Sequence, residues 1–114
     1  MDFVNEFPQM PPLEVDEVIS CLRNRWEVTY DMQLVQRGKR LYLQIMWGYL
    51  EQQSFPLDEE AYREHLQRIF EVVNRLGLAS MVREWLEKTP KKPRVGRPIS
   101  LPLEAKEGFG EFVL

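Results

Sequence analysis

This sequence is poor in the residues that build most catalytic and metal sites. It has one histidine, His65, and one cysteine, Cys21, among 114 residues. A zinc site with the usual nitrogen and sulfur ligands is therefore nearly excluded, and Cys21 cannot form an internal disulfide. A Ser-His-Asp triad would depend on His65 alone, with no nucleophile-elbow sequence beside it. The six glycines are scattered and form no phosphate-binding pattern. We expect no cofactor or metal site and predict that the protein is not an enzyme.

Long apolar runs and an excess of positive charge are also absent. No run of about 18 apolar residues occurs, so we expect no membrane span. Asp2 and Glu6 lie where a signal peptide would carry cations, and with a lone cysteine this indicates a cytoplasmic protein. A formal net charge of -3 and a pI near 5.2 argue against general binding to polyanions. A composition of 44% hydrophobic and 29% charged residues is typical of one globular domain.

The few candidate chemical groups have simpler structural explanations. His65 borders the apolar stripe of a predicted helix, which favours a partly buried structural role over that of a general base. Cys21 adjoins another apolar stripe and is expected to be a packing residue. The acidic run at residues 58–60 is better explained by helix capping than by metal binding.

A β-hairpin over residues 26–50 is the strongest pattern in the chain. Apolar residues occupy even positions from Trp26 to Leu34 and odd positions from Leu41 to Tyr49. A two-residue loop at Arg37-Gly38 would place all of them on one face, with Leu34 opposite Leu41 and Met32 opposite Leu43. A longer even-numbered loop and a helical ending near residues 47–48 remain open, because short apolar runs are ambiguous.

Three amphipathic helices are predicted around this hairpin. The first covers residues 13–24, with Pro12 suited to its first turn. The second has Asp58 as its N-cap, three i,i+4 Glu–Arg pairs on its outer face and Gly77 just past its end. The third starts at about Leu78 and stops before Pro90. The last two should form a bent pair on one face of the hairpin.

The predicted fold class is therefore α+β: an N-terminal helix, an antiparallel β-hairpin, a two-helix pair packed on the sheet, and a short C-terminal edge strand within residues 99–103. Pro102 would limit that strand to an edge. Residues 1–12 are expected to be a flexible arm, with docking of its apolar residues as the alternative. Residues 13–114 are expected to be one domain that includes a basic extended segment at 88–98.

Several short motifs together resemble a small domain-of-unknown-function family of cyanobacteria and plastids. They are Trp26-Glu27-Val28, residues 38–43, Met46-Trp47, residues 49–52, Ser54-Phe55-Pro56, residues 93–96 and residues 100–103. The likeness covers about residues 13–114, and residues 46–56 are its most specific part. It implies a compact α+β domain of unusual topology in an oxygenic phototroph, with no established activity and no catalytic residues to carry over. Pro98 departs from the family pattern, so backbone pairing is not expected there.

Positive charge is concentrated in two places on this acidic chain, and we predict that both bind a partner. The first group is Lys88, Lys91, Lys92, Arg94 and Arg97, and the second is Arg37, Lys39 and Arg40. Such segregation would attract an anionic partner. Our first hypothesis is a non-enzymatic interaction module, an auxiliary or assembly-type protein that docks an acidic protein. The alternative is RNA or single-stranded nucleic-acid binding, with Tyr42 or Trp47 as stacking surfaces. An enzyme with a pocket between hairpin and helices is a third, weaker hypothesis. The sequence does not determine the oligomeric state.

Overall fold

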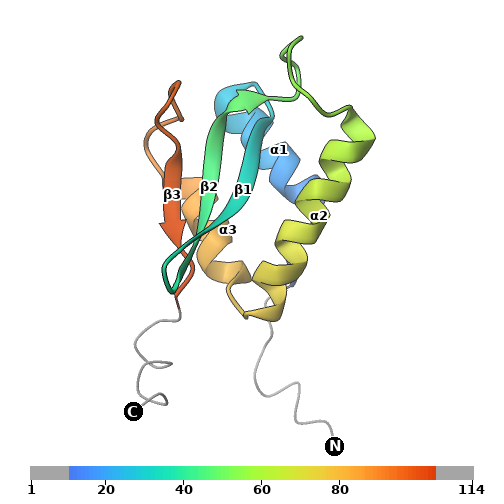
Figure 1. Ribbon diagram of the computed structural model, residues 1–114. Helices are drawn as coiled ribbons and strands as arrows, with labels where there is room; N and C mark the ends of the chain where they lie inside the picture. The colour runs from blue at the N-terminus through green and yellow to red at the C-terminus, as the bar shows by residue number, and fades with distance from the viewer. Residues whose placement is uncertain (1–10, 105–114) are drawn as a thin grey trace, which may run out of the picture.

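The computed structural model describes residues 11–104 as an open sheet with helices on one of its faces (Figure 1). In chain order the elements are α1 (Val15–Trp26), β1 (Tyr30–Arg37), β2 (Arg40–Tyr49), α2 (Glu59–Arg75), α3 (Ala79–Lys88) and β3 (Ile99–Pro102). The strands form an antiparallel sheet in the order β1-β2-β3. The predicted α+β class is confirmed, including the hairpin, the helix pair and the short edge strand. The predictions for residues 1–10 and 105–114 lie outside the described residues.

The hairpin is confirmed, but its turn and register differ from the prediction. The loop is Gly38-Lys39, and Arg37 pairs with Arg40. Gly38 has φ +62°, which suits the first loop position of a type II′ turn and which Arg37 would adopt only with strain. Leu34 therefore pairs with Leu43 and not with Leu41.

The register error left the buried face unchanged. Met32 pairs with Ile45 instead of Leu43, a shift of two positions, and a shift of two keeps each side chain on its face. Met32, Leu43 and Ile45 are all fully buried. An irregularity lies between Met32 and the pair Tyr30–Tyr49, and beside it Trp47 is 36% exposed instead of facing inward. The alternative of a helical ending near residue 47 is wrong, because β2 continues to Tyr49.

The boundary between α1 and the hairpin also lies elsewhere than predicted. The residues expected to begin the first strand, Trp26 and Val28, are not in it, since α1 continues to Trp26. Glu27 then ends the helix with φ +67°, and its N–H donates to the Arg23 carbonyl. Trp26 also lies one helical turn after the buried Leu22, so its spacing fits a helix as well as a strand.

Helix α1 begins two residues later than expected, because Glu14 before it is extended, with φ -119° and ψ 152°. The Asn74 side chain on α2 bonds both backbone polar groups of Leu13. The Leu13 N–H donates to Asn74 Oδ1 at 2.8 Å, and Asn74 Nδ2 donates to the Leu13 carbonyl at 3.0 Å. The Leu13 side chain is buried in the core.

Both predicted ends of α2 are confirmed. Asp58 Oδ1 accepts the Ala61 N–H at 2.8 Å, and Gly77 has φ +75°. The Leu78 N–H donates to the Val73 carbonyl and the Gly77 N–H to the Asn74 carbonyl, which is a Schellman motif. The predicted i,i+4 pair between Glu59 and Arg63 forms, whereas within residues 11–104 neither Arg68 nor Arg75 makes a salt bridge.

Candidate functional site

The basic segment contains a tight turn that presents an apolar residue at its tip. The N–H of Arg94 donates to the carbonyl of Arg97 at 3.1 Å, and the N–H of Arg97 donates back at 2.7 Å. Val95 and Gly96 are thus the two loop residues, and Gly96 takes the positive φ of +74° that the turn requires. Val95 is 84% exposed. We call residues 91–97 the basic turn.

Contacts at both ends hold the basic turn in place. Before it, Arg25 of α1 donates to the Leu86 carbonyl at 2.7 Å and to the Thr89 carbonyl at 2.5 Å. Arg25 also lies over the Trp26 ring, 4.6 Å from its centroid. Within the turn Pro93 is buried, and after it β3 pairs with β2. The turn is therefore anchored to α3 on one side and to the sheet on the other.

The cations of the basic turn have no carboxylate partners among the described residues. Lys91, Lys92, Arg94 and Arg97 are all exposed, and no Asp or Glu of residues 11–104 lies within 4 Å of their charged groups. Lys88 differs, because its Nζ lies 3.0 Å from Glu84 Oε2. Of the five predicted residues in this segment, four are thus free to bind an anionic group.

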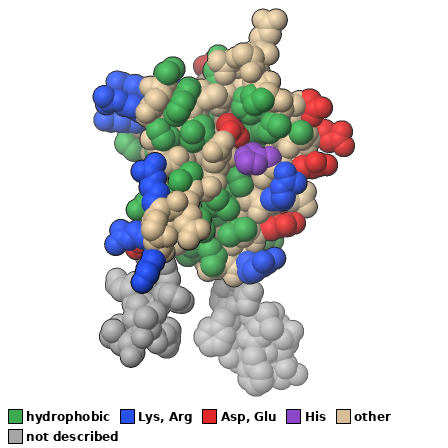
Figure 2. All heavy atoms as spheres, viewed as in Figure 1, with side chains coloured by type: hydrophobic (Ala, Val, Ile, Leu, Met, Phe, Trp, Pro, Cys, Tyr) green, Lys and Arg blue, Asp and Glu red, His purple; other side chains and the backbone are tan. Residues whose placement is uncertain are grey.

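The hairpin tip is a second cationic locus at the other end of the sheet. Arg40 Nε lies 3.1 Å from Glu104 Oε2, whereas Arg37 and Lys39 are exposed and make no salt bridge within the part of the chain that the structure describes. Ile99 pairs with Ile45, so the same register places Arg97 level with Trp47. Trp47 is seven residues from Arg40 along β2, and the two cationic groups are therefore roughly 20 Å apart. The two predicted groups are therefore not one patch. Figure 2 shows Lys and Arg side chains at several heights along the left side of the molecule.

His65 supports the fold at the edge of β1. Its Nε2 lies 2.6 Å from the Met32 carbonyl and 3.5 Å from Asp31 Oδ1. One helical turn before it, the buried Tyr62 donates its hydroxyl to the Tyr30 carbonyl at 2.7 Å. Burial raises the pKa of Tyr62 far above its usual value, and the negative charge of Asp31 adds to that effect. These contacts agree with the structural role predicted for His65.

Cys21 also lies in a packing environment. Its side chain is half-buried, and its Sγ lies 3.6 Å from the Leu86 carbonyl. Burial raises the pKa of the Cys21 thiol, although the nearby Arg25 charge opposes the shift. The thiol therefore stays protonated at neutral pH, which disfavours nucleophilic chemistry.

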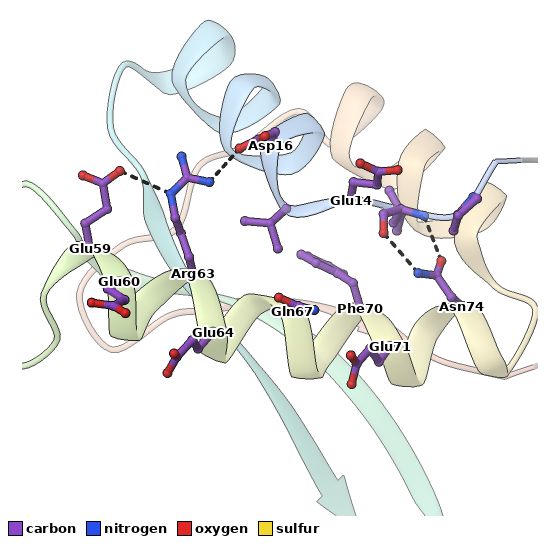
Figure 3. Close-up of a pocket in the computed structure, with 13 residues that line it drawn as sticks. Glu14, Asp16, Glu59, Glu60, Arg63, Glu64, Gln67, Phe70, Glu71 and Asn74 are labelled. Atoms are coloured by element: carbon purple, nitrogen blue, oxygen red, sulfur yellow. Dashed lines mark hydrogen bonds and ion pairs between the residues drawn. The ribbon is translucent and has the colours of Figure 1, made fainter.

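The predicted acid cluster lies at one end of an acidic hollow between α1 and α2 (Figure 3). The hollow has a volume of about 860 Å³. Arg63 spans it, donating to Asp16 Oδ1 at 2.6 Å and to Glu59 Oε2 at 3.2 Å. Hydrogen bonds to these two carboxylates raise the pKa of Arg63. Within residues 11–104 no three His, Cys, Asp or Glu side chains are grouped to hold a metal ion. The acids here cap α2 and join it to α1.

Val95 is the residue that our sequence analysis missed. The four cations around it were identified, but the apolar residue between them was not, although Val95-Gly96 flanked by Arg94 and Arg97 has the form of a two-residue turn. The exposure of Val95 depends on the position of the turn, which the sequence does not specify.

Comparisons with known proteins give a family and a structural relative. Residues 16–113 match the family described as "Domain of unknown function (DUF3067)". The solution NMR structure of the Alr2454 protein from the cyanobacterium Nostoc sp. strain PCC 7120 is similar, with a TM-score of 0.79 and 34% sequence identity. The match covers 90% of this chain and 98% of that one. No curated protein matches. Within residues 11–104 no helix has the length and apolar character needed to cross a membrane. The resemblance found in the sequence is thus confirmed, and the chain belongs to the DUF3067 family.

Proposed function

We propose that this protein is a non-enzymatic interaction module that docks an acidic partner protein through its basic turn. It would act as an auxiliary or assembly-type protein of oxygenic phototrophs, in the cytoplasm. The observation that carries the proposal is a hydrogen-bonded turn whose tip, Val95, is 84% exposed. Four cations lie in the turn and just before it, and none of them has a carboxylate partner within residues 11–104.

The basic turn presents two exposed arginines, Arg94 and Arg97, on either side of an exposed apolar side chain. Arginine is enriched at protein interfaces. The turn is held by its two cross-turn hydrogen bonds and by Arg25, so binding requires little ordering of the backbone. Unpaired cations on a chain of net charge -3 would also orient an acidic partner during approach.

The test begins with a photo-crosslinking amino acid in place of Val95 in the full chain. Crosslinking in native cells and mass spectrometry would identify the partner, and the purified partner would then be titrated at low and moderate salt. We expect an acidic protein whose affinity falls as salt rises, because exposed charges are screened.

A matched pair of variants tests the site itself. Lys91→Glu with Arg94→Glu should weaken binding about tenfold or more, because attraction becomes repulsion at the contact. The control is Arg68→Glu with Arg75→Glu, which changes the net charge of the protein by the same amount at two exposed positions of α2. This control should leave the affinity for the partner nearly unchanged. Equal affinity for both double variants would reject the basic turn as the docking site.

Single-stranded nucleic-acid binding is the alternative function. Tyr42 is partly exposed on the face of the sheet away from the helices, and Trp47 is 36% exposed, so both could stack on bases. Titration with single-stranded RNA would test it. Binding that weakens steeply with salt and is lost in Lys91→Glu with Arg94→Glu would favour RNA over an acidic protein.

A further inference from the structure

The sheet has one face covered by helices and one open face. The side chains on the open face form three cross-strand rows: Arg37–Arg40, Val35–Tyr42–Pro102 and Gln33–Gln44–Ser100. The first row carries positive charge, the second is apolar and the third is neutral and polar. In the third row Gln44 Nε2 donates to Ser100 Oγ at 2.9 Å.

The apolar row is not part of the core. Val35 and Tyr42 are partly buried by their neighbours in the sheet, yet neither belongs to the residues packed on the hydrophobic core, and Pro102 is exposed. Figure 2 views this face, and hydrophobic side chains run along it between Lys and Arg on the left and a mixture of acidic and basic side chains on the right. Apolar side chains grouped beside charged ones on an open face indicate an interaction surface.

A partner cannot extend the sheet at the start of β1. The carbonyls of Tyr30 and Met32 are already used, because Tyr30 accepts from the Tyr62 hydroxyl and Met32 interacts with His65. Both side chains come from α2, which therefore covers this part of the edge.

The edge at β3 is closed by prolines. The Leu103 N–H donates to the Leu41 carbonyl at 2.8 Å, and bonding positions alternate along an antiparallel pair. Ser100 and Pro102 therefore direct their backbone groups away from β2, and Pro98 occupies the preceding outward position. Proline has no N–H, so only Ser100 can donate to an added strand.

We infer that the partner of the basic turn also lies across the open sheet face, placing an apolar side chain on the Val35–Tyr42–Pro102 row and carboxylates near Arg37 and Lys39. This inference rests on the proposed function. β3 joins the basic turn to the apolar row, and Arg97 and Pro102 are about 17 Å apart along an extended chain. One partner segment can therefore reach both.

The charge pattern favours an acidic protein segment over a nucleic acid. Arg37 and Lys39 make no salt bridge within the described range, so they can bind the carboxylates of a partner. Tyr42 is the one aromatic residue in the three rows, and one base could stack on it. Glu104 beside Arg40 would repel a continuous phosphate backbone.

The experiment maps amide chemical shifts of the full chain during titration with three probes. The first is an acidic peptide of about eight residues with a central Phe-Leu, which can span roughly 27 Å when extended. The second has Gly-Ser in place of Phe-Leu, and the third is an oligouridylate of similar length. We expect the first peptide to shift amides of both the basic turn and the apolar row.

The outcomes separate the two proposals. Shifts confined to the basic turn with the first peptide would overturn this inference and leave the proposed function standing, and no shifts at all would count against both. Stronger shifts of the apolar row with oligouridylate would assign the face to nucleic acid.

Variants of the apolar row give a second readout. Tyr42→Ser should lower the affinity for the Phe-Leu peptide at least about threefold. It should leave the affinity for the Gly-Ser peptide unchanged, because only the Phe-Leu peptide contacts the apolar row. Val35→Thr keeps a β-branched side chain and should have the same selective effect if Tyr42→Ser proves unstable. Equal losses for both peptides would contradict an apolar contact at this row.

Discussion

Tyr62 ties helix α2 to the edge strand β1 through one buried hydrogen bond. Its side chain is fully buried, and its hydroxyl donates to the Tyr30 carbonyl at 2.7 Å.

Glu51 has a similar linking role in the loop after β2. Its carboxylate accepts the Thr29 N–H at 2.8 Å and the Thr29 hydroxyl at 2.6 Å, and it lies 3.6 Å from Arg23. Each of these residues satisfies backbone or side-chain groups that would otherwise lose their partners.

Tyr62→Phe should destabilise the fold without changing its shape. The substitution keeps the ring but leaves the Tyr30 carbonyl without its donor, which costs about 1–2 kcal/mol of unfolding free energy. Chemical denaturation followed by tryptophan fluorescence would measure it. Tyr42→Phe is the control, because Tyr42 lies on the open face, and it should change stability by less than about 0.5 kcal/mol. Equal stability of Tyr62→Phe and the unsubstituted protein would show that the buried hydrogen bond contributes nothing.

Glu51 should make the fold less stable in acid. Burial alone would raise the pKa of Glu51, but hydrogen bonds from Thr29 and the charge of Arg23 outweigh it, and the pKa of Glu51 is lowered on folding. The ionised carboxylate therefore stabilises the folded state above its unfolded pKa of about 4.3, and this contribution is lost as the pH falls through the lower folded value.

Glu51→Gln should flatten this acid-side loss of stability. The measurement is the unfolding free energy between about pH 5 and pH 2, with Glu71→Gln on the exposed face of α2 as the control. An unchanged pH slope in Glu51→Gln, matching that of Glu71→Gln, would contradict the assignment.

At the scale of elements, two features determine how the sheet and the basic turn are presented. Arg25 of α1 satisfies carbonyls at the C-terminal end of α3, where four backbone acceptors lack helical partners. Prolines near and within β3 remove donors from the outer edge of the sheet. The first feature fixes where the chain leaves α3, and the second prevents the sheet from adding strands.

Arg25→Ala should loosen the basic turn. Loss of the bonds to Leu86 and Thr89 should cost about 1–2 kcal/mol. Hydrogen exchange of the Arg94 and Arg97 amides should speed up more than that of the sheet amides. Arg68→Ala, at an exposed position of α2, is the control. Unaltered exchange at Arg94 and Arg97 would show that the turn is held by other contacts.

Pro98→Thr with Pro102→Thr should promote association between sheets. Threonine restores two outward N–H donors at the β3 edge, so copies of the chain could pair edge to edge. Size-exclusion chromatography with light scattering should show a higher mean mass as concentration rises. Pro90→Thr, at an exposed proline outside any strand, should not change the mass. An unchanged mass for the double variant would mean that proline does not protect this edge.

At the scale of the whole molecule, the candidate binding cations lie away from the acidic hollow. Carboxylates line the hollow between α1 and α2, whereas the basic turn and the hairpin tip carry cations that have no carboxylate partner within residues 11–104. The cations therefore contribute little to the fold and remain available to a partner.

Neutralising the basic turn should leave stability nearly unchanged. Glutamine at positions 91, 92, 94 and 97 removes four positive charges and takes the formal net charge from -3 to -7. Because these side chains are exposed and have no carboxylate partner within the described part of the chain, the melting temperature should shift by no more than about 4 °C. A much larger drop would show that the four cations stabilise the fold.

Local patterns in the sequence determined most of the elements. The N-cap at Asp58 and the left-handed Gly77 depend on neighbouring residues alone, and both ends of α2 were predicted correctly. Period-two alternation placed Met32 and Leu43 on the buried face, even though their partners were misassigned. The cations of the candidate site were also visible as a run of charge, because composition requires no knowledge of contacts.

Long-range contacts decided the rest. Near the start of α1, Leu13 is bonded by Asn74, which is 61 positions away. The hairpin register is the exception, because it follows from the left-handed φ of Gly38 in the loop itself. The exposure of Val95 and the separation of the two cationic loci depend on how β3 pairs with β2. The sequence by itself thus determined which residues are helical, extended or charged, because those preferences act over one or two turns of chain. Only the tertiary structure decided which cations lack partners and which face of the sheet stays open, because both depend on packing between distant segments.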